Sequence, residues 1–142
     1  MLNTAESTPQ STTDNASPPL LPADEIALGK NIYTIHCASC HGQKLEGEAN
    51  WKQQNEDGSF RSPPHSADGH TWHHADSVLI EAIKEGGARY EGMDIGVTSN
   101  MPAFAGILTD EEITAVLTYI KDTWPQDIRW QQWQLTIQSD AQ

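Results

Sequence analysis

The stretch Cys37-Ala38-Ser39-Cys40-His41 is the most informative part of this 142-residue sequence. Its two cysteines are three positions apart, close to one helical turn, and the histidine follows the first cysteine by four positions. Side chains three and four positions apart are neighbours on a helix, so this spacing brings two thiols and one imidazole together. The chain has only these two cysteines, so it contains neither a disulfide framework nor a second thiol pair.

The pentapeptide has the form C-x-x-C-H, which is the attachment signature of c-type haem. Each thiol can add to one haem vinyl group, while His41 is held below the iron as the proximal ligand. A C-x-x-C pair also occurs in redox dithiols and in zinc sites. A zinc site needs a second cysteine pair or a clean histidine pair, and a redox dithiol needs a βαβ context that this sequence lacks. We therefore expect one haem c, bound covalently through Cys37 and Cys40.

The hydrophobic periodicity predicts helices over 23–39, 76–86 and 109–124. Acidic residues suit the first turn of the first helix, Asp76 suits the N-cap of the second, and a capping box opens the third. Residues 42–71 carry no sustained period and predict a long surface-wrapping loop. Loops of this length usually have a function or cover a ligand.

The expected fold class is all-α, because no alternating β pattern of useful length and no internal repeat is visible. Only 37% of the residues are hydrophobic, which is little for a core built from side chains alone. We expect three to four helices and long loops wrapped around the covalently bound haem, which then completes the core.

Over residues 23–124 the sequence resembles the class I c-type cytochromes. The matching features are Gly29 and Tyr33 ahead of the C-x-x-C-H motif, the segment Asn100-Met101-Pro102-Ala103-Phe104, and Tyr119 in the last predicted helix. The resemblance implies the cytochrome c-like fold, in which the two terminal helices cross with Gly29 against Tyr119. It also implies a haem that carries electrons.

The resemblance makes Met101, followed by the stiff Pro102, the distal iron ligand, and both residues are expected to contact the haem. A thioether ligand raises the reduction potential. Met93 lies among polar residues and is expected to be a loop residue. Histidine is the competing ligand, and a bis-histidine haem would still transfer electrons, at a lower potential; the candidates lie at positions 65, 70, 73 and 74. His36 adjoins the motif and is expected at the surface or the haem edge.

His70, His73 and His74 form a cluster, which is either a second metal site or part of the haem edge. Imidazoles are common copper ligands, so the cluster is a candidate second metal site. Alternatively, the cluster lines the haem edge together with Trp72. The resemblance implies that Trp72 or Trp51 donates its indole N–H to a haem propionate.

The proximal ligand departs from the family in one respect. Many family members have a proline shortly after the motif, whose carbonyl accepts the proximal imidazole N–H. No proline occurs within residues 42–51, so the sequence leaves open which carbonyl orients His41.

The predicted domain organisation is a tail and one domain. Residues 1–22 are rich in Ser, Thr and Pro and predict a disordered tail or tether, including a membrane tether whose signal or anchor has been removed. Residues 23–142 form the cytochrome c domain, with a C-terminal extension from about residue 125. Trp130 and Trp133 in this extension are expected to pack back on the domain.

The chain has 8 basic and 20 acidic residues, a formal charge of −12, which argues against nucleic-acid binding. We expect an extracytoplasmic, periplasmic carrier of single electrons with no catalytic site. Its expected partners are redox proteins with a basic docking patch: a terminal oxidase, a quinol-oxidising complex or a periplasmic oxidoreductase. Two alternatives remain, an open-site haem of the peroxidase or gas-binding kind and a haem/copper module that uses the histidine cluster.

Overall fold

The computed structural model describes residues 17–90, 93, 96 and 98–140. Within this part the regular structure is helical, and the all-α class is confirmed. The α-helices are α1 (Ala23–His36), α2 (Ala38–His41), α3 (Asp76–Glu85), α4 (Asp110–Asp122) and α5 (Gln126–Asp140), joined by two 3₁₀ helices, η2 (Thr71–His73) and η3 (Gly86–Tyr90). The described part thus has five α-helices where three to four were expected, because the stretch after Pro125 is helical and the predicted first helix is divided into α1 and α2.

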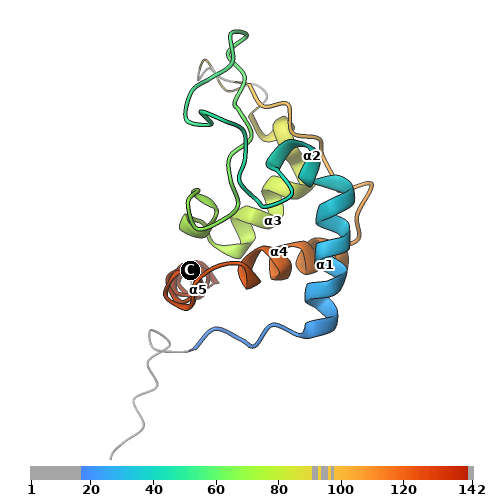
Figure 1. Ribbon diagram of the computed structural model, residues 1–142, viewed down its shortest axis with the longest axis vertical. Coiled ribbons are helices and arrows are strands. Elements are labelled where there is room, and N and C mark those ends of the chain that lie inside the picture. Colours follow the sequence, from blue (N-terminus) through green and yellow to red (C-terminus); the bar gives the residue numbers. More distant parts are fainter. Residues whose placement is uncertain (1–16, 91–92, 94–95, 97, 141–142) are drawn as a thin grey trace, which may run out of the picture.

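Helices α1 and α4 cross at the base of the molecule and form its most extensive helix contact (Figure 1). Gly29 makes this crossing possible. A methyl group on Gly29 would lie 2.5 Å from the carbonyl carbon of Ala115 and 2.9 Å from Cβ of Tyr119. The expectation that Gly29 packs against Tyr119 is therefore confirmed, and a glycine is required because the two backbones nearly touch.

The predicted capping box of α4 is present. The Thr109 hydroxyl accepts from the Glu112 amide at 3.1 Å, and the Glu112 carboxylate accepts from the Thr109 amide at 3.0 Å. The first helix, in contrast, does not continue to residue 39. Cys37 leaves helical geometry with φ of −117°, so α1 ends at His36 and the separate turn α2 begins at Ala38.

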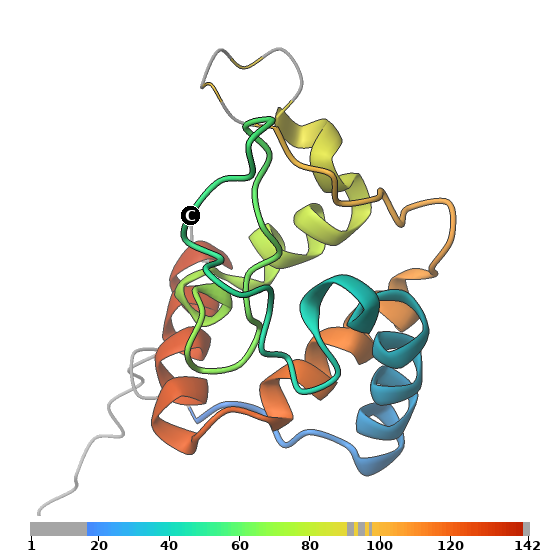
Figure 2. The same cartoon turned by 45° about the horizontal axis from the view of Figure 1, so that its top comes forward.

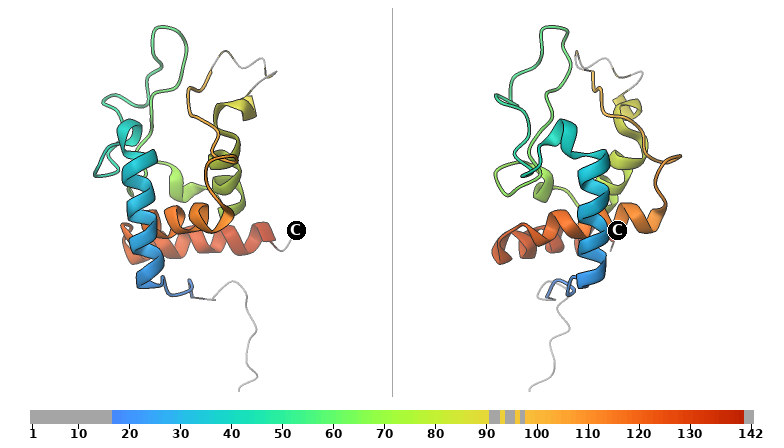
Figure 3. Two further views of the ribbon diagram at one scale, coloured as in Figure 1. Left: turned by 90° about the vertical axis from the view of Figure 1, so that its right-hand side faces the viewer. Right: turned by 45° about the vertical axis from the view of Figure 1, so that its right-hand side comes forward.

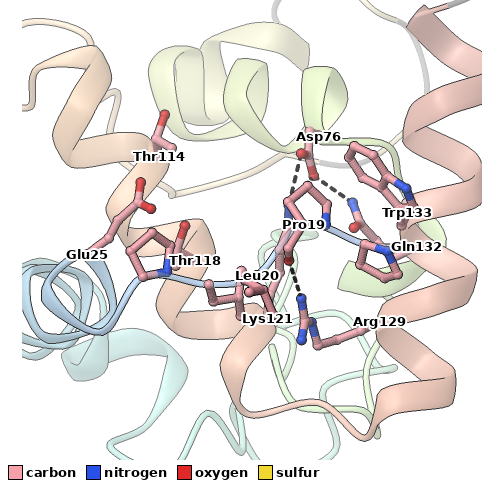
Figure 4. Close-up of a pocket in the computed structure, with 13 residues that line it drawn as sticks. Pro19, Leu20, Glu25, Asp76, Thr114, Thr118, Lys121, Arg129, Gln132 and Trp133 are labelled. Atoms are coloured by element: carbon pink, nitrogen blue, oxygen red, sulfur yellow. Dashed lines mark hydrogen bonds and ion pairs between the residues drawn. The ribbon is translucent and has the colours of Figure 1, made fainter. Parts of the chain in front are cut away.

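Asp76 does not cap α3, because the N-cap is Ala75 and Asp76 is the first residue of the helix. Its carboxylate is used elsewhere (Figure 4). Lys121 of α4 lies 2.7 Å from Oδ1, and the amide of Gln132 in α5 also donates to Oδ1 at 2.7 Å. Asp76 therefore joins three helices.

Helix α5 covers η2 and the start of α3. Gln132 and Thr136 are its buried residues; the Gln132 side chain donates to the carbonyl of His74 at 3.1 Å. Trp130 and Trp133 are partly buried, in agreement with the expectation that they pack back on the domain. Because its buried contacts are polar, α5 lacks the apolar stripe that identifies a helix in a sequence.

Of the predicted tail 1–22, residues 1–16 lie outside the described residues. Residues 18–22 run as an extended strap past α4 and α5 and line a pocket of about 170 Å³ with them (Figure 4). Arg129 of α5 donates to the carbonyl of Pro19 at 2.9 Å. None of the described helices is long and apolar enough to cross a bilayer.

Two regions, each made of a loop and a helix, stand above the α1/α4 base. The 42–70 loop and α2 lie on one side, and α3 with the 98–108 segment lies on the other (Figures 2 and 3). The two sides meet at the top, where Ser59 and Thr98 form an isolated parallel bridge. Candidate ligands from α2 and from the 98–108 segment thus come from opposing walls.

Candidate haem-binding site

The motif residues lie on the tight turn of α2. The thiols of Cys37 and Cys40 are unpaired; Cys37 is partly buried and Cys40 is exposed. The hydroxyl of the buried Tyr33 donates to the carbonyl of Gly42 at 2.7 Å, and Gly42 adopts φ of +89°, which favours glycine. The turn that carries the thiols is therefore held by Tyr33 on its core side, while the Cys40 thiol on it is exposed.

The Cys37 thiol is not activated as a free nucleophile. Burial, with a smaller effect of the neighbouring Cys40, raises its pKa to about 11. Redox dithiols and metal-binding thiols need the thiolate, which a lowered pKa favours. Among the residues that the structure describes, no group of three or more histidine, cysteine or acidic side chains is arranged to hold a metal ion. A Cys37 thiol that stays protonated is less suited to a redox dithiol.

His41 is 8% exposed, and its Nδ1 lies 2.8 Å from the carbonyl oxygen of Pro63. This contact answers the question of which carbonyl orients the ring. The acceptor is a proline carbonyl 22 residues away in the sequence, beyond the short window after the motif. With Nδ1 engaged, Nε2 is the nitrogen available to iron. Burial lowers the pKa of His41, although the Pro63 bond and Glu48 oppose this shift, so the neutral, ligating form is favoured.

His65 supports His41 from behind, a role that the sequence did not indicate. The two imidazole rings lie 4.0 Å apart between centroids, and Nδ1 of His65 lies 2.7 Å from the hydroxyl oxygen of Thr71. Trp124 donates its indole N–H to the backbone carbonyl of His65 at 2.8 Å. Burial, and then the charge of His41, lowers the pKa of His65 to about 3. Because His65 lies against the proximal imidazole, this position does not suit a distal ligand.

Met101 is partly buried and packs against the hydrophobic core cluster, as do Cys37 and Trp72. Met93 is 56% exposed, as expected for a loop residue. Pro102, the other residue expected to contact the haem, is exposed. A hollow of about 400 Å³ lies beside Met101, between residues 98–101 and η3.

These residues fit a covalently bound haem by the chemistry of their donors. Two unpaired thiols and a neutral, oriented imidazole lie on one wall, and a thioether lies among apolar side chains on the segment opposite. Haem c attachment uses two such thiols and a proximal histidine, and His/Met pairs are a standard axial set. Met101 as the distal ligand stays a prediction that rests on this fit.

The two tryptophans that are candidates for a propionate bond lie in different surroundings, and such a bond from either one stays a prediction. Trp72 packs on the core cluster, but its single indole N–H donates to the carbonyl of Ala67 at 2.9 Å, so it is not free for a propionate in this arrangement. Trp51 lies edge-on to His70, with the ring centroids 5.0 Å apart. Trp72 therefore contributes by packing.

The histidine cluster, the candidate copper site, lies at and beside η2. The rings of His70 and His73 lie 5.5 Å apart between centroids, and His73 stacks on Trp72 at 3.7 Å. No group of three or more candidate ligands is arranged to hold a metal ion in the described part of the chain, and copper binding by the cluster stays a prediction. His36 is partly buried, and its ring approaches Phe104 with the centroids 5.9 Å apart. The cluster is thus an aromatic surface beside η2.

A helical domain with a C-x-x-C-H turn, an oriented proximal imidazole and an opposing thioether segment defines a c-type cytochrome. The cytochrome c family profile matches residues 26–124, most of the chain, and the chain belongs to the cytochrome c family. It is 28% identical over 102 residues to the cbb3-type cytochrome c oxidase subunit FixP of Rhizobium etli. That match covers 72% of this chain but only 31% of FixP, so the chain spans about a third of that relative. No solved structure matches it significantly.

Proposed function

We propose that this cytochrome carries single electrons between redox proteins, with His41 and Met101 as the axial ligands of one haem c. The observation that supports the proposal best is the environment of His41. Its Nδ1 is held by the Pro63 carbonyl and its ring is packed against His65. A ligand fixed in this way keeps its orientation when the charge on iron changes.

When bound, haem c supplies a one-electron iron couple. Four side chains of this chain would hold the group: Cys37 and Cys40 would bind the macrocycle, and His41 and Met101 would bind the iron. Because His41 and Met101 come from opposing walls that the Ser59/Thr98 bridge joins, the chain would need no large rearrangement during electron transfer. A site closed by two protein ligands has no open position for substrate, so the proposed protein is a carrier and not an enzyme.

The proposed location is outside the cytoplasm, in the periplasm, as part of or next to a membrane-bound respiratory complex. Two observations support this. Haem attachment to C-x-x-C-H takes place outside the cytoplasm, and the similar FixP protein is a subunit of a cbb3-type cytochrome c oxidase. The formal charge of −12 favours a partner with a basic patch, such as a terminal oxidase, and an association that weakens as salt is added.

The test is an optical spectrum of the purified haem protein, oxidised and reduced, with and without carbon monoxide. The proposal expects a methionine-to-ferric charge-transfer band in the parent and no carbon monoxide shift. Met101→Ala should remove the band and open the iron to carbon monoxide, whereas Met93→Ala, at an exposed loop methionine, is the matched control and should leave both unchanged. High-spin bands or ready carbon monoxide binding in the parent would instead support the open-site alternative.

A further inference from the structure

The segment around Met101 is held by backbone contacts on both sides. Before it, the Phe60 amide donates to the Thr98 carbonyl at 2.8 Å, across the bridge that joins the two loop regions. After it, the Phe104 amide donates to the carbonyl of Ile83 in α3 at 3.0 Å. Met101 thus lies between two fixed points of a short extended segment.

The middle of the segment rests on the first two residues of η3. The Gly87 amide donates to the Met101 carbonyl at 2.8 Å. A methyl group on Gly87 would overlap the carbonyl oxygen of Ser99, with the Ser99 carbonyl carbon 3.0 Å away. A methyl group on Gly86 would lie 2.5 Å from the carbonyl oxygen of Met101, and Gly86 has φ of +55°. Both glycines therefore allow the two backbones to touch where any side chain would separate them.

We infer that Gly86 and Gly87 are positioning residues that seat the Met101 thioether. This inference rests on the proposed role of Met101 as a ligand. A support directly behind the Met101 carbonyl restricts the backbone of the ligand before binding, which reduces the entropy lost when the thioether binds. Gly87 is the better probe of the two, because its backbone lies outside the left-handed region and alanine there adds only bulk.

The experiment compares Gly87→Ala with Gly106→Ala, both as complete haem proteins. Gly106 lies in the same connection to α4, and a methyl group there would meet nothing within 4 Å. Titration of the ferric protein with imidazole measures how readily the thioether is displaced. Gly87→Ala should raise the apparent imidazole affinity about tenfold, or about 1.4 kcal/mol, and weaken the charge-transfer band; Gly106→Ala should match the parent.

A purely structural role for Gly87 would lower the unfolding midpoint while leaving imidazole affinity and the charge-transfer band at parental values, and that result would overturn the inference. Parallel titration of Met101→Ala separates the ligand assignment from the inference about Gly87. If the parent and Met101→Ala bind imidazole with the same affinity, Met101 is not the ligand, and both claims are refuted. If the parent differs from Met101→Ala but has the same imidazole affinity as Gly87→Ala, only the inference is refuted.

A second measurement on the parent covers the case in which Gly87→Ala yields no folded haem protein. Hydrogen exchange of the Gly87 amide is followed with and without saturating imidazole. If the Gly87 bond to Met101 stabilises thioether ligation, displacing the thioether should speed exchange at Gly87 about tenfold, while the amides of α4 remain unchanged. Equal exchange at Gly87 in both conditions would overturn the inference.

Discussion

Replacing Gly29 by alanine should loosen the crossing of α1 and α4. The new methyl group would overlap the Ala115 carbonyl oxygen and lie 2.5 Å from its carbon, where ordinary contacts begin at 3.4 Å, so the helices must separate by at least about 1 Å. Such overpacking costs about 1–3 kcal/mol, and a gap of this size loses part of the dispersion energy along the interface. Alanine regains up to about 1 kcal/mol in helix propensity. We therefore expect a net loss of about 1–2 kcal/mol.

The assay is guanidinium unfolding of the haem protein, followed by far-UV circular dichroism. Asn31→Ala, on the exposed face of the same helix, is the control for propensity and should be neutral or slightly stabilising. A loss of about 1–2 kcal/mol corresponds to a decrease of about 3–8 °C in Tm for a domain of this size. A Gly29→Ala protein as stable as Asn31→Ala would refute the close crossing and the packing argument built on it.

Two further predictions concern stability. Because burial lowers the pKa of His65 from 6.5 to about 3, the unfolded chain binds a proton that the folded chain does not; the free energy of unfolding should fall below pH 6.5 by at most about 1.4 kcal/mol per pH unit. His65→Gln should flatten this slope in thermal unfolding from pH 7 to pH 4, whereas His73→Gln, at an exposed ring, should keep it. Asp76→Asn should lower the free energy of unfolding, measured with denaturant, by about 1–2 kcal/mol, because it weakens an ion pair with Lys121 that is largely shielded from solvent. Asp110→Asn, in an exposed ion pair with Lys84, should change the free energy of unfolding little. Equal losses of unfolding free energy in the two variants would contradict this explanation.

The parts of the fold that the sequence predicts correctly are fixed by local chemistry or implied by the family resemblance. The capping box of α4 needs only Thr109 and Glu112, three positions apart, and the crossing at Gly29 follows from a family resemblance. The C-x-x-C-H turn is likewise local. Spacing of three and four residues is a strong signal because one helical turn brings those side chains together.

The parts that the sequence misses depend on contacts between distant segments. Nothing next to the motif indicates that the Pro63 carbonyl accepts from His41, since the two residues are 22 positions apart and are brought together by the 42–70 loop. Asp76 has the residue type of an N-cap, but its carboxylate is drawn to Lys121 and Gln132 on two other helices. The buried residues of helix α5 are Gln132 and Thr136, whose side chains hydrogen-bond each other, so no hydrophobic period reveals the helix.

The strap formed by residues 18–22 has a practical consequence. It enters at the end of the molecule that is remote from α2 and from the 98–102 segment (Figure 1). A protein immobilised on an electrode through residues before the strap would present its ligand-bearing end outward. Arg129, which binds the Pro19 carbonyl, would then help to set the orientation of the whole domain on the surface.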